Sequence, residues 1–217
     1  KFWDLYLRNA EEEDQVNIEN WKGDADGILF FTGLFAVIVA AFVVDSYKRL
    51  SPDSGDETVA LLRQIAAASN GMPIPAPDPP LDNFAPPAIA IVVNTFWFLS
   101  LILSLICALG ATLIQQWARA YQRKLQRPRT PQTRAILHGI LIQGVERYGF
   151  DRASSLVVSF LHVAVALFMI GLIVFLFPIN SIVAGASLGL AGIAACIYAA
   201  LTVLPFFSPD CPYSTPI

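Results

Sequence analysis

Charged side chains are scarce in this sequence. They make up 14% of its 217 residues, whereas an ordinary soluble domain carries about 25%. This shortage argues against a soluble globular domain and indicates that lipid surrounds much of the chain. The formal net charge is only −3, and the sequence contains no basic face that suggests nucleic acid, so we expect no nucleic-acid partner.

Cysteine is also rare. The three cysteines, Cys107, Cys196 and Cys211, lie far apart, and two of them fall inside apolar runs. Their spacing indicates neither a disulfide framework nor a metal cluster. The sequence also shows no spacing typical of metal ligands or of a catalytic nucleophile. It therefore predicts no metal, no cofactor and no catalytic residue, and it favours a protein that is not an enzyme.

Charge is missing altogether from four long apolar runs. They cover about residues 28–44, 88–114, 156–177 and 181–204, and none of them contains Asp, Glu, Lys or Arg. Each can cross the hydrocarbon core of a bilayer as an α-helix, although the first run is at the short limit. Proton relays, voltage sensors and coupled transporters ordinarily need ionisable groups at membrane depth, so this lack counts against all three classes.

The segments around these runs complete the predicted fold. The residues before about 25 predict a short amphipathic helix that either lies at the membrane surface or packs on the protein's own cytosolic parts, and the second interpretation is favoured at least equally. Asp24 or Asp26 can cap the first span. Residues 72–87 are rich in proline, which predicts an irregular connector. We therefore predict an all-α membrane protein. It forms a single domain over residues 1–217, with four transmembrane helices plus short amphipathic interfacial helices.

Residues 115–155 form a basic loop between the second and third spans. It holds eight of the fourteen Lys and Arg residues. An excess of positive charge favours the cytosolic side, which predicts that this loop and both termini face the cytosol. Basic residues at a membrane surface also attract anionic lipid headgroups. The residues that we expect to contact headgroups are Arg119, Arg123, Lys124, Arg127 and Arg129.

Small residues recur on two of the predicted spans. Small side chains let helices approach closely in lipid, and hydroxyl groups among them can hydrogen-bond across the contact. They stand at four-residue intervals in the second span, and the fourth span contains a GxxxG pair within a longer small-residue repeat. The predicted helix-packing residues are Ser100, Ser104, Ala108, Thr112, Gly185 and Gly189. A homo-oligomer is therefore expected, with the lipid bilayer as the other partner.

Three polar side chains lie within or beside the spans. Asn94 can hydrogen-bond between helices or face a pore, and the interhelical bond is favoured. Gln115 ends the second span and is a candidate pore residue. His162 can act as a proton-sensitive gate or as an interfacial or helix-bonded residue, and the second interpretation is favoured.

Several stretches of the chain resemble a known family. The most specific are NTFWFLSL at 94–101 and the closing CPYSTPI at 211–217, and further likeness includes WKGDADGILFFTGLF at 21–35 and SYKRLSPD at 46–53. The chain is similar to multi-pass membrane proteins of basidiomycete fungi that share a domain of unknown function. The resemblance implies a fungal integral membrane protein. It brings no established activity, so it assigns no functional residue.

We therefore expect an integral membrane protein that assembles with itself as a non-enzymatic scaffold or anchor. The first alternative is an oligomeric channel with its pore between subunits. Its candidate lining residues are Ser100, Ser104, Thr112 and Gln115. The second alternative is a membrane enzyme that acts on lipid at the cytosolic face through His138 or Glu146.

Overall fold

Helices make up nearly all of the structure. A computed structural model describes residues 2–51, 54–69, 85–126 and 130–207. In chain order the elements are α1 (Phe2–Ser46), the 3-10 helix η1 (Tyr47–Leu50), α2 (Ser54–Ser69), α3 (Ala88–Leu125), α4 (Pro131–Tyr148), α5 (Phe150–Leu176) and α6 (Ser181–Phe207). Four of them, α1, α3, α5 and α6, are long and apolar enough to cross a membrane. This confirms the predicted fold class.

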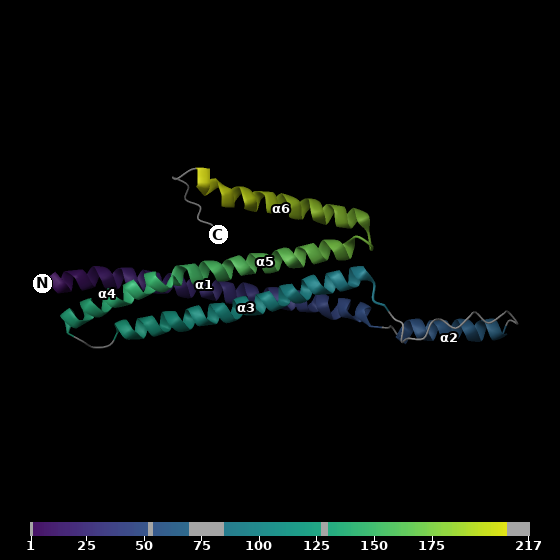
Figure 1. The fold of residues 1–217 in the computed structure, drawn as a ribbon, viewed down its shortest axis with the longest axis horizontal. Coiled ribbons are helices and arrows are strands. Elements are labelled where there is room, and N and C mark those ends of the chain that lie inside the picture. The colour runs from purple at the N-terminus through teal and green to yellow at the C-terminus, as the bar shows by residue number, and fades with distance from the viewer. Residues whose placement is uncertain (1, 52–53, 70–84, 127–129, 208–217) are drawn as a thin grey trace.

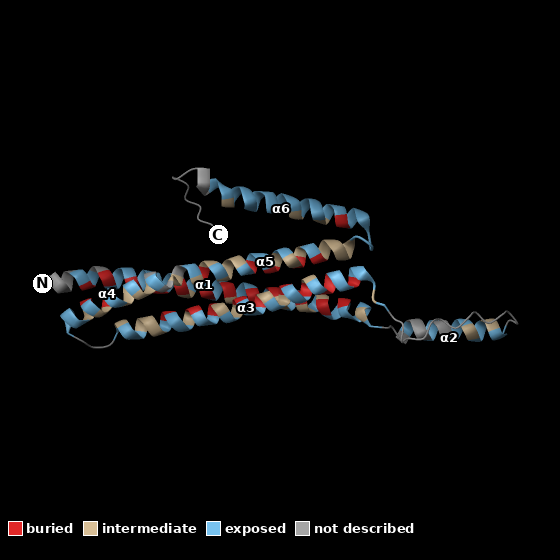
Figure 2. Ribbon diagram, in the orientation of Figure 1, coloured by how far each residue is buried: buried red, intermediate tan, exposed pale blue. Residues whose placement is uncertain are grey.

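Three of the long helices form a bundle. α1, α3 and α5 lie side by side (Figure 1), and their buried residues face one another along the bundle axis (Figure 2). On α3 the buried positions recur at alternating intervals of three and four residues. This spacing keeps one face of a helix turned toward its neighbour, as in a coiled coil. The positions are Ala90, Val93, Trp97, Ser100, Ser104, Cys107, Ala111, Ile114 and Ala118.

α1 is continuous from Phe2 to Ser46, a length of about 68 Å. The segment expected to form a separate surface helix belongs to the same helix as the first span, so neither Asp24 nor Asp26 caps a new helix. The reason is that the packed face continues past the predicted boundary. Residues on both sides of it share one buried cluster with α3, namely Ile18, Trp21, Ala25 and Ile28.

α6 is held differently from the other long helices. Residues 177–180 join it to α5, and the Asn180 side chain accepts hydrogen bonds from the amides of Ile182 and Val183 at 2.9 and 3.2 Å, which caps the new helix. From this turn α6 diverges from α5 (Figure 1). Among its described side chains Ala184 is the one that is buried, and Figure 2 shows the rest of the helix almost entirely exposed.

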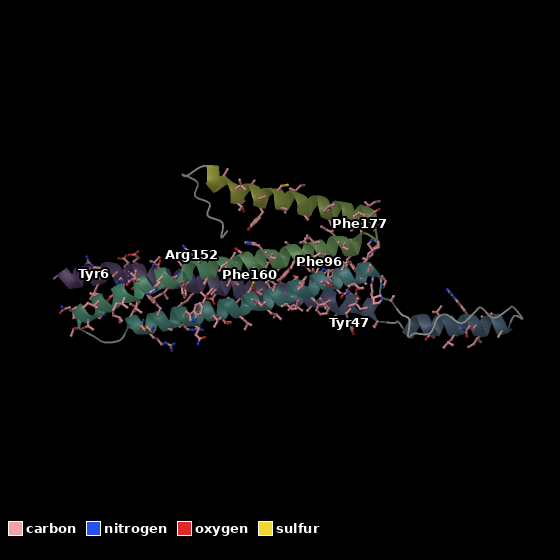
Figure 3. The ribbon with its side chains drawn as sticks, viewed as in Figure 1. Tyr6, Tyr47, Phe96, Arg152, Phe160 and Phe177 are labelled. Atoms are coloured by element: carbon pink, nitrogen blue, oxygen red, sulfur yellow. The ribbon has the colours of Figure 1, made fainter. Side chains whose placement is uncertain are left out.

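Helix ends extend beyond several predicted spans. α3 starts at Ala88 as predicted but continues past Ile114 to Leu125, and α5 starts at Phe150, before the predicted third span. α2 lies beyond one end of the bundle (Figure 1), near the end marked by Tyr47 and opposite Tyr6 (Figure 3). The prolines at 73–80, together with Arg127 and Arg129, lie outside the described residues.

Candidate functional site

Two glycines set the distance between α3 and α5. A Cβ atom at Gly171 would lie 2.6 Å from the indole nitrogen of Trp97, and one at Gly110 would lie 2.8 Å from Cγ2 of Val157. Trp97 is fully buried, and its Nε1 donates to the Phe168 carbonyl at 3.3 Å. Neither glycine position has room for a larger residue, so the seam between α3 and α5 depends on both.

Two predicted packing residues lie buried in this seam. Ser100 Oγ donates to the carbonyl of Ala164 on α5 at 2.7 Å, whereas Ser104 Oγ donates to the Leu101 carbonyl of its own helix at 2.8 Å. Both hydroxyl groups are therefore satisfied inside one chain. This placement does not fit the channel hypothesis, which required them to line a path between subunits.

The other two predicted packing residues of the second span, Ala108 and Thr112, are not buried between α3 and α5. Ala108 is half-buried, and Thr112 is exposed with its hydroxyl donating to the Leu109 carbonyl at 2.7 Å. A four-residue step turns about 400° around a helix, so the stripe drifts by about 40° at each step. The contact within the chain follows Cys107 and Ala111 instead. Within the chain, the buried positions of α3 follow alternating steps of three and four rather than steps of four.

Asn94 lies between α1 and α3. It is 2% exposed, and its Nδ2 donates to the hydroxyl of Ser46 at 2.9 Å and to the Ser46 carbonyl at 3.3 Å. A third bond runs to the Ala90 carbonyl of its own helix at 2.8 Å. The amide therefore links the two helices and does not face a water-filled path.

The GxxxG pair on α6 has no packing neighbour among the residues that the structure describes. A Cβ at Gly185 or at Gly189 would meet no atom within 4 Å, and the same holds at Gly192. These three glycines share one helix face, because positions i, i+4 and i+7 line up. We call this the glycine face. The contact with α5 uses another face, formed by Ala184, Ser187 and Ala191.

His162 lies between α5 and α6 where the two helices diverge. Its Nδ1 is 3.4 Å from the hydroxyl of Tyr198, and the two ring centroids are 5.1 Å apart. Both side chains are exposed. The pair therefore bridges the gap between α5 and α6 with long side chains rather than with a close backbone contact.

A buried polar network lies beyond the apolar runs, where α1 and α3 extend past the spans and α4 packs on them. His138 Nε2 lies 3.0 Å from Asp14 Oδ2, and Asp14 Oδ1 accepts a hydrogen bond from Tyr121 at 2.8 Å. The hydroxyl of Tyr6 lies 3.2 Å from His138 Nδ1. Asp14 and His138 are 3% and 4% exposed. Neither of these two facing atoms has an aligned hydrogen-bond partner among the described residues.

Burial controls the protonation of this network. Desolvation raises the pKa of Asp14 above its usual value, and the Tyr121 hydrogen bond and the nearby His138 oppose this only in part. Burial also raises the pKa of Tyr121, and the neighbouring Asp14 carboxylate raises it further. Tyr121 therefore stays protonated and remains a donor. The network joins three helices through groups that are costly to bury alone.

The predicted boundary residues lie between this network and the spans. Gln115 donates to the Asp26 carboxylate on α1, and its carbonyl oxygen accepts from Arg119 at 3.2 Å. Arg123 and Lys124 are exposed in the last turn of α3. Gln115 therefore crosslinks α1 and α3 at the boundary rather than facing a pore.

Sequence reasoning missed Asp14 and Tyr121. They are 107 positions apart, so only the register of α1 against α3 brings them together. One signal was present: Asp14 follows Leu7 and Ala10 and precedes Ile18 at steps of three and four, all of them buried. An acidic residue at a seam position indicates a buried partner, whereas its neighbours Glu12 and Glu13 are exposed.

These observations define the class of protein. The chain is helical, and its four candidate membrane-spanning helices make it an integral membrane protein. A family model matches residues 3–178, so the chain belongs to DUF6535, a family of unknown function. The matched range extends from α1 through α5 and ends before α6. No curated protein and no solved structure matches the chain. The fungal source implied by the resemblance stays a prediction.

Proposed function

We propose that this protein is a non-enzymatic membrane scaffold or anchor that assembles with a second copy of itself through α6. The observation that carries the proposal is the glycine face, Gly185, Gly189 and Gly192, which has no packing neighbour within the described part of the chain. The seam between α3 and α5 provides the comparison, because its glycines meet a neighbouring side chain closely.

Helix energetics support a partner for this face. Glycine in a helix interior is about 1 kcal/mol less favourable than alanine. Lipid chains contact alanine or leucine at least as well, so lipid alone gives no advantage to three glycines in line. A second helix does, because glycine lets the two backbones approach and form Cα–H···O contacts. A twofold axis brings the same face of two copies together, which makes a second copy the simplest partner.

The alternative functions find less support. In a channel between subunits, Ser100 and Ser104 would not be available to line the pore, because their hydroxyl groups bond carbonyl groups inside the chain. In a lipid-acting enzyme, His138 would have to reach the substrate. This side chain is only 4% exposed and contacts Asp14 and Tyr6. The Glu146 side chain lies outside the described residues.

The proposed scaffold has its basic loop and both termini in the cytosol. The exposed cations Arg119, Arg123 and Lys124 lie beyond the end of the second span, which supports this orientation by the positive-inside rule. Cysteine labelling of sealed vesicles from one side at a time tests it. Labelling of a cysteine at Arg123 only from the lumenal side would contradict it.

The mass of the assembly in lipid nanodiscs tests the scaffold itself. Native mass spectrometry of the full chain should give a dimer or a larger assembly, and replacing both Gly185 and Gly189 with Leu should give monomers. Ala194→Leu is the matched control, because Ala194 is exposed and lies on the opposite side of α6 from the glycine face. A monomeric wild type, or a double variant with unchanged mass, would remove the basis of the proposal.

A further inference from the structure

A cavity of about 650 Å³ lies between the end of α3, α4 and the start of α5, with Trp21 of α1 on its wall. Sites for small ligands usually occupy about 300–1,000 Å³. The size of the cavity is therefore that of a ligand site, and it is separate from the glycine face of α6.

The wall of the cavity is aromatic on the side nearest the bilayer. The ring of Phe150 lies 4.5 Å from that of Trp21 and 5.9 Å from that of Trp117, measured between centroids. Much of the remaining lining is aliphatic and includes Ile140 and Leu141. Such a surface gains free energy by covering a hydrocarbon chain and offers little to a polar ligand.

One charge stands on this apolar wall. Among the described lining residues Lys124 is the only charged one. Tyr121 also lines the cavity, but its hydroxyl donates to Asp14. Charge recognition of a ligand at this wall therefore falls on the Lys124 ammonium group, which selects an anion.

The two ends of the cavity lie at different depths. Trp117 is about 4.5 Å and Lys124 about 15 Å along α3 from Ile114, the last residue of the apolar run. The aromatic end therefore borders the hydrocarbon, and the cationic end lies in the headgroup or water layer. This polarity fits an amphiphile whose chain points toward the bilayer and whose anionic head points outward.

We propose that this cavity binds a single-chain anionic lipid, with its acyl chain along Trp21, Trp117 and Phe150 and its head on Lys124. The bound lipid would contact α1, α3, α4 and α5 at once. It would thus link the extramembrane network to the boundary of the spans.

The first test fills the cavity. Gly144 lines it, and a Cβ there meets no atom of the described residues within 4 Å, so this position accepts a side chain and Gly144→Leu adds volume at the cavity wall. Gly139 is the matched control, because it is an exposed glycine on the same helix that does not line the cavity. Oleate binding to the full chain in micelles, counted by native mass spectrometry, should be lost in Gly144→Leu and retained in Gly139→Leu.

The second test removes the charge. Lys124→Gln should weaken oleate binding by roughly tenfold and leave the binding of neutral oleyl alcohol unchanged. Arg123→Gln removes the neighbouring exposed cation and should change neither. Equal oleate occupancy in the wild type and Gly144→Leu would overturn the site. An equal loss of oleate and of oleyl alcohol in Lys124→Gln would overturn the role of the head.

Discussion

The seam between α3 and α5 and the glycine face of α6 are built from the same kinds of small residue but differ in what surrounds them. In the seam, Gly110 and Gly171 meet Val157 and Trp97 so closely that no Cβ fits. On α6 a Cβ at Gly185 or Gly189 meets no atom of the described residues within 4 Å. Small residues therefore mark where a close contact can form, and the register of the neighbouring helix decides whether it forms within the chain.

The largest difference in stability between the seam and the glycine face should come from replacing one glycine in each with alanine. Gly171→Ala places Cβ against the buried Trp97, and we expect a loss of about 1–3 kcal/mol in the free energy of unfolding, since overpacked cores cost this much. Gly189→Ala should be neutral or stabilising by up to about 1 kcal/mol, because alanine favours the helix. Reversible unfolding in mixed micelles measures both. Equal stability of Gly171→Ala and the wild type would show that the seam is looser than described.

The pH dependence of stability tests whether Asp14 is buried in the polar network outside the apolar spans. Because burial raises the pKa of Asp14 above 3.8, its contribution to stability is fully present below that pH and is lost as the pH rises through the raised value. Asp14→Asn stays neutral and escapes this loss. The stability of Asp14→Asn relative to the wild type should therefore increase with pH over that range, measured by thermal unfolding.

Asp24→Asn is the matched control for the pH experiment, because Asp24 is an exposed aspartate on the same helix. Because Asp24 is not buried, Asp24→Asn should not show the rise expected for Asp14→Asn. A constant difference between Asp14→Asn and the wild type at every pH would mean that Asp14 titrates like a solvated carboxyl group.

The smallest effect concerns single hydroxyl groups. Ser100→Ala removes the bond to the Ala164 carbonyl across the seam, and we expect a cost of about 0.6 kcal/mol, the average for such bonds in membranes. Thr112→Ala removes a hydroxyl that bonds its own helix on the exposed side, so its cost should be near zero. Steric-trapping measurements can resolve the two values. A larger cost for Thr112→Ala than for Ser100→Ala would reverse the assignment of the inner face.

Hydropathy predicted the four spans well because the physical signal is local. A run of uncharged residues such as 88–114 is excluded from water whatever its neighbours are, so the four spans and the all-helical class could be predicted from composition along the chain. The ends of the helices could not. Hydropathy reports where lipid begins, whereas α3 continues to Leu125 because Ala118 still packs on α1.

The packing face of α3 and the partners in the polar network could not be predicted from one stretch of sequence alone. The buried positions of α3 were visible as alternating steps of three and four, but Ser104, Ala108 and Thr112 also formed a regular pattern, and composition alone does not choose between them. The partnership of Asp14 with His138 and Tyr121 depends on how three helices align. Only the three-dimensional register supplies that alignment.

The continuity of α1 has a mechanical consequence. About 33 Å of unbroken helix separates Tyr6 from Ile28, where the apolar run begins. A helix whose apolar length does not match the bilayer changes its tilt, and a change of about 10° would move Tyr6 by about 6 Å. Since α1 has no hinge in this region, it acts as a lever. A change in membrane thickness that tilted α1 would therefore move its amino-terminal end as well.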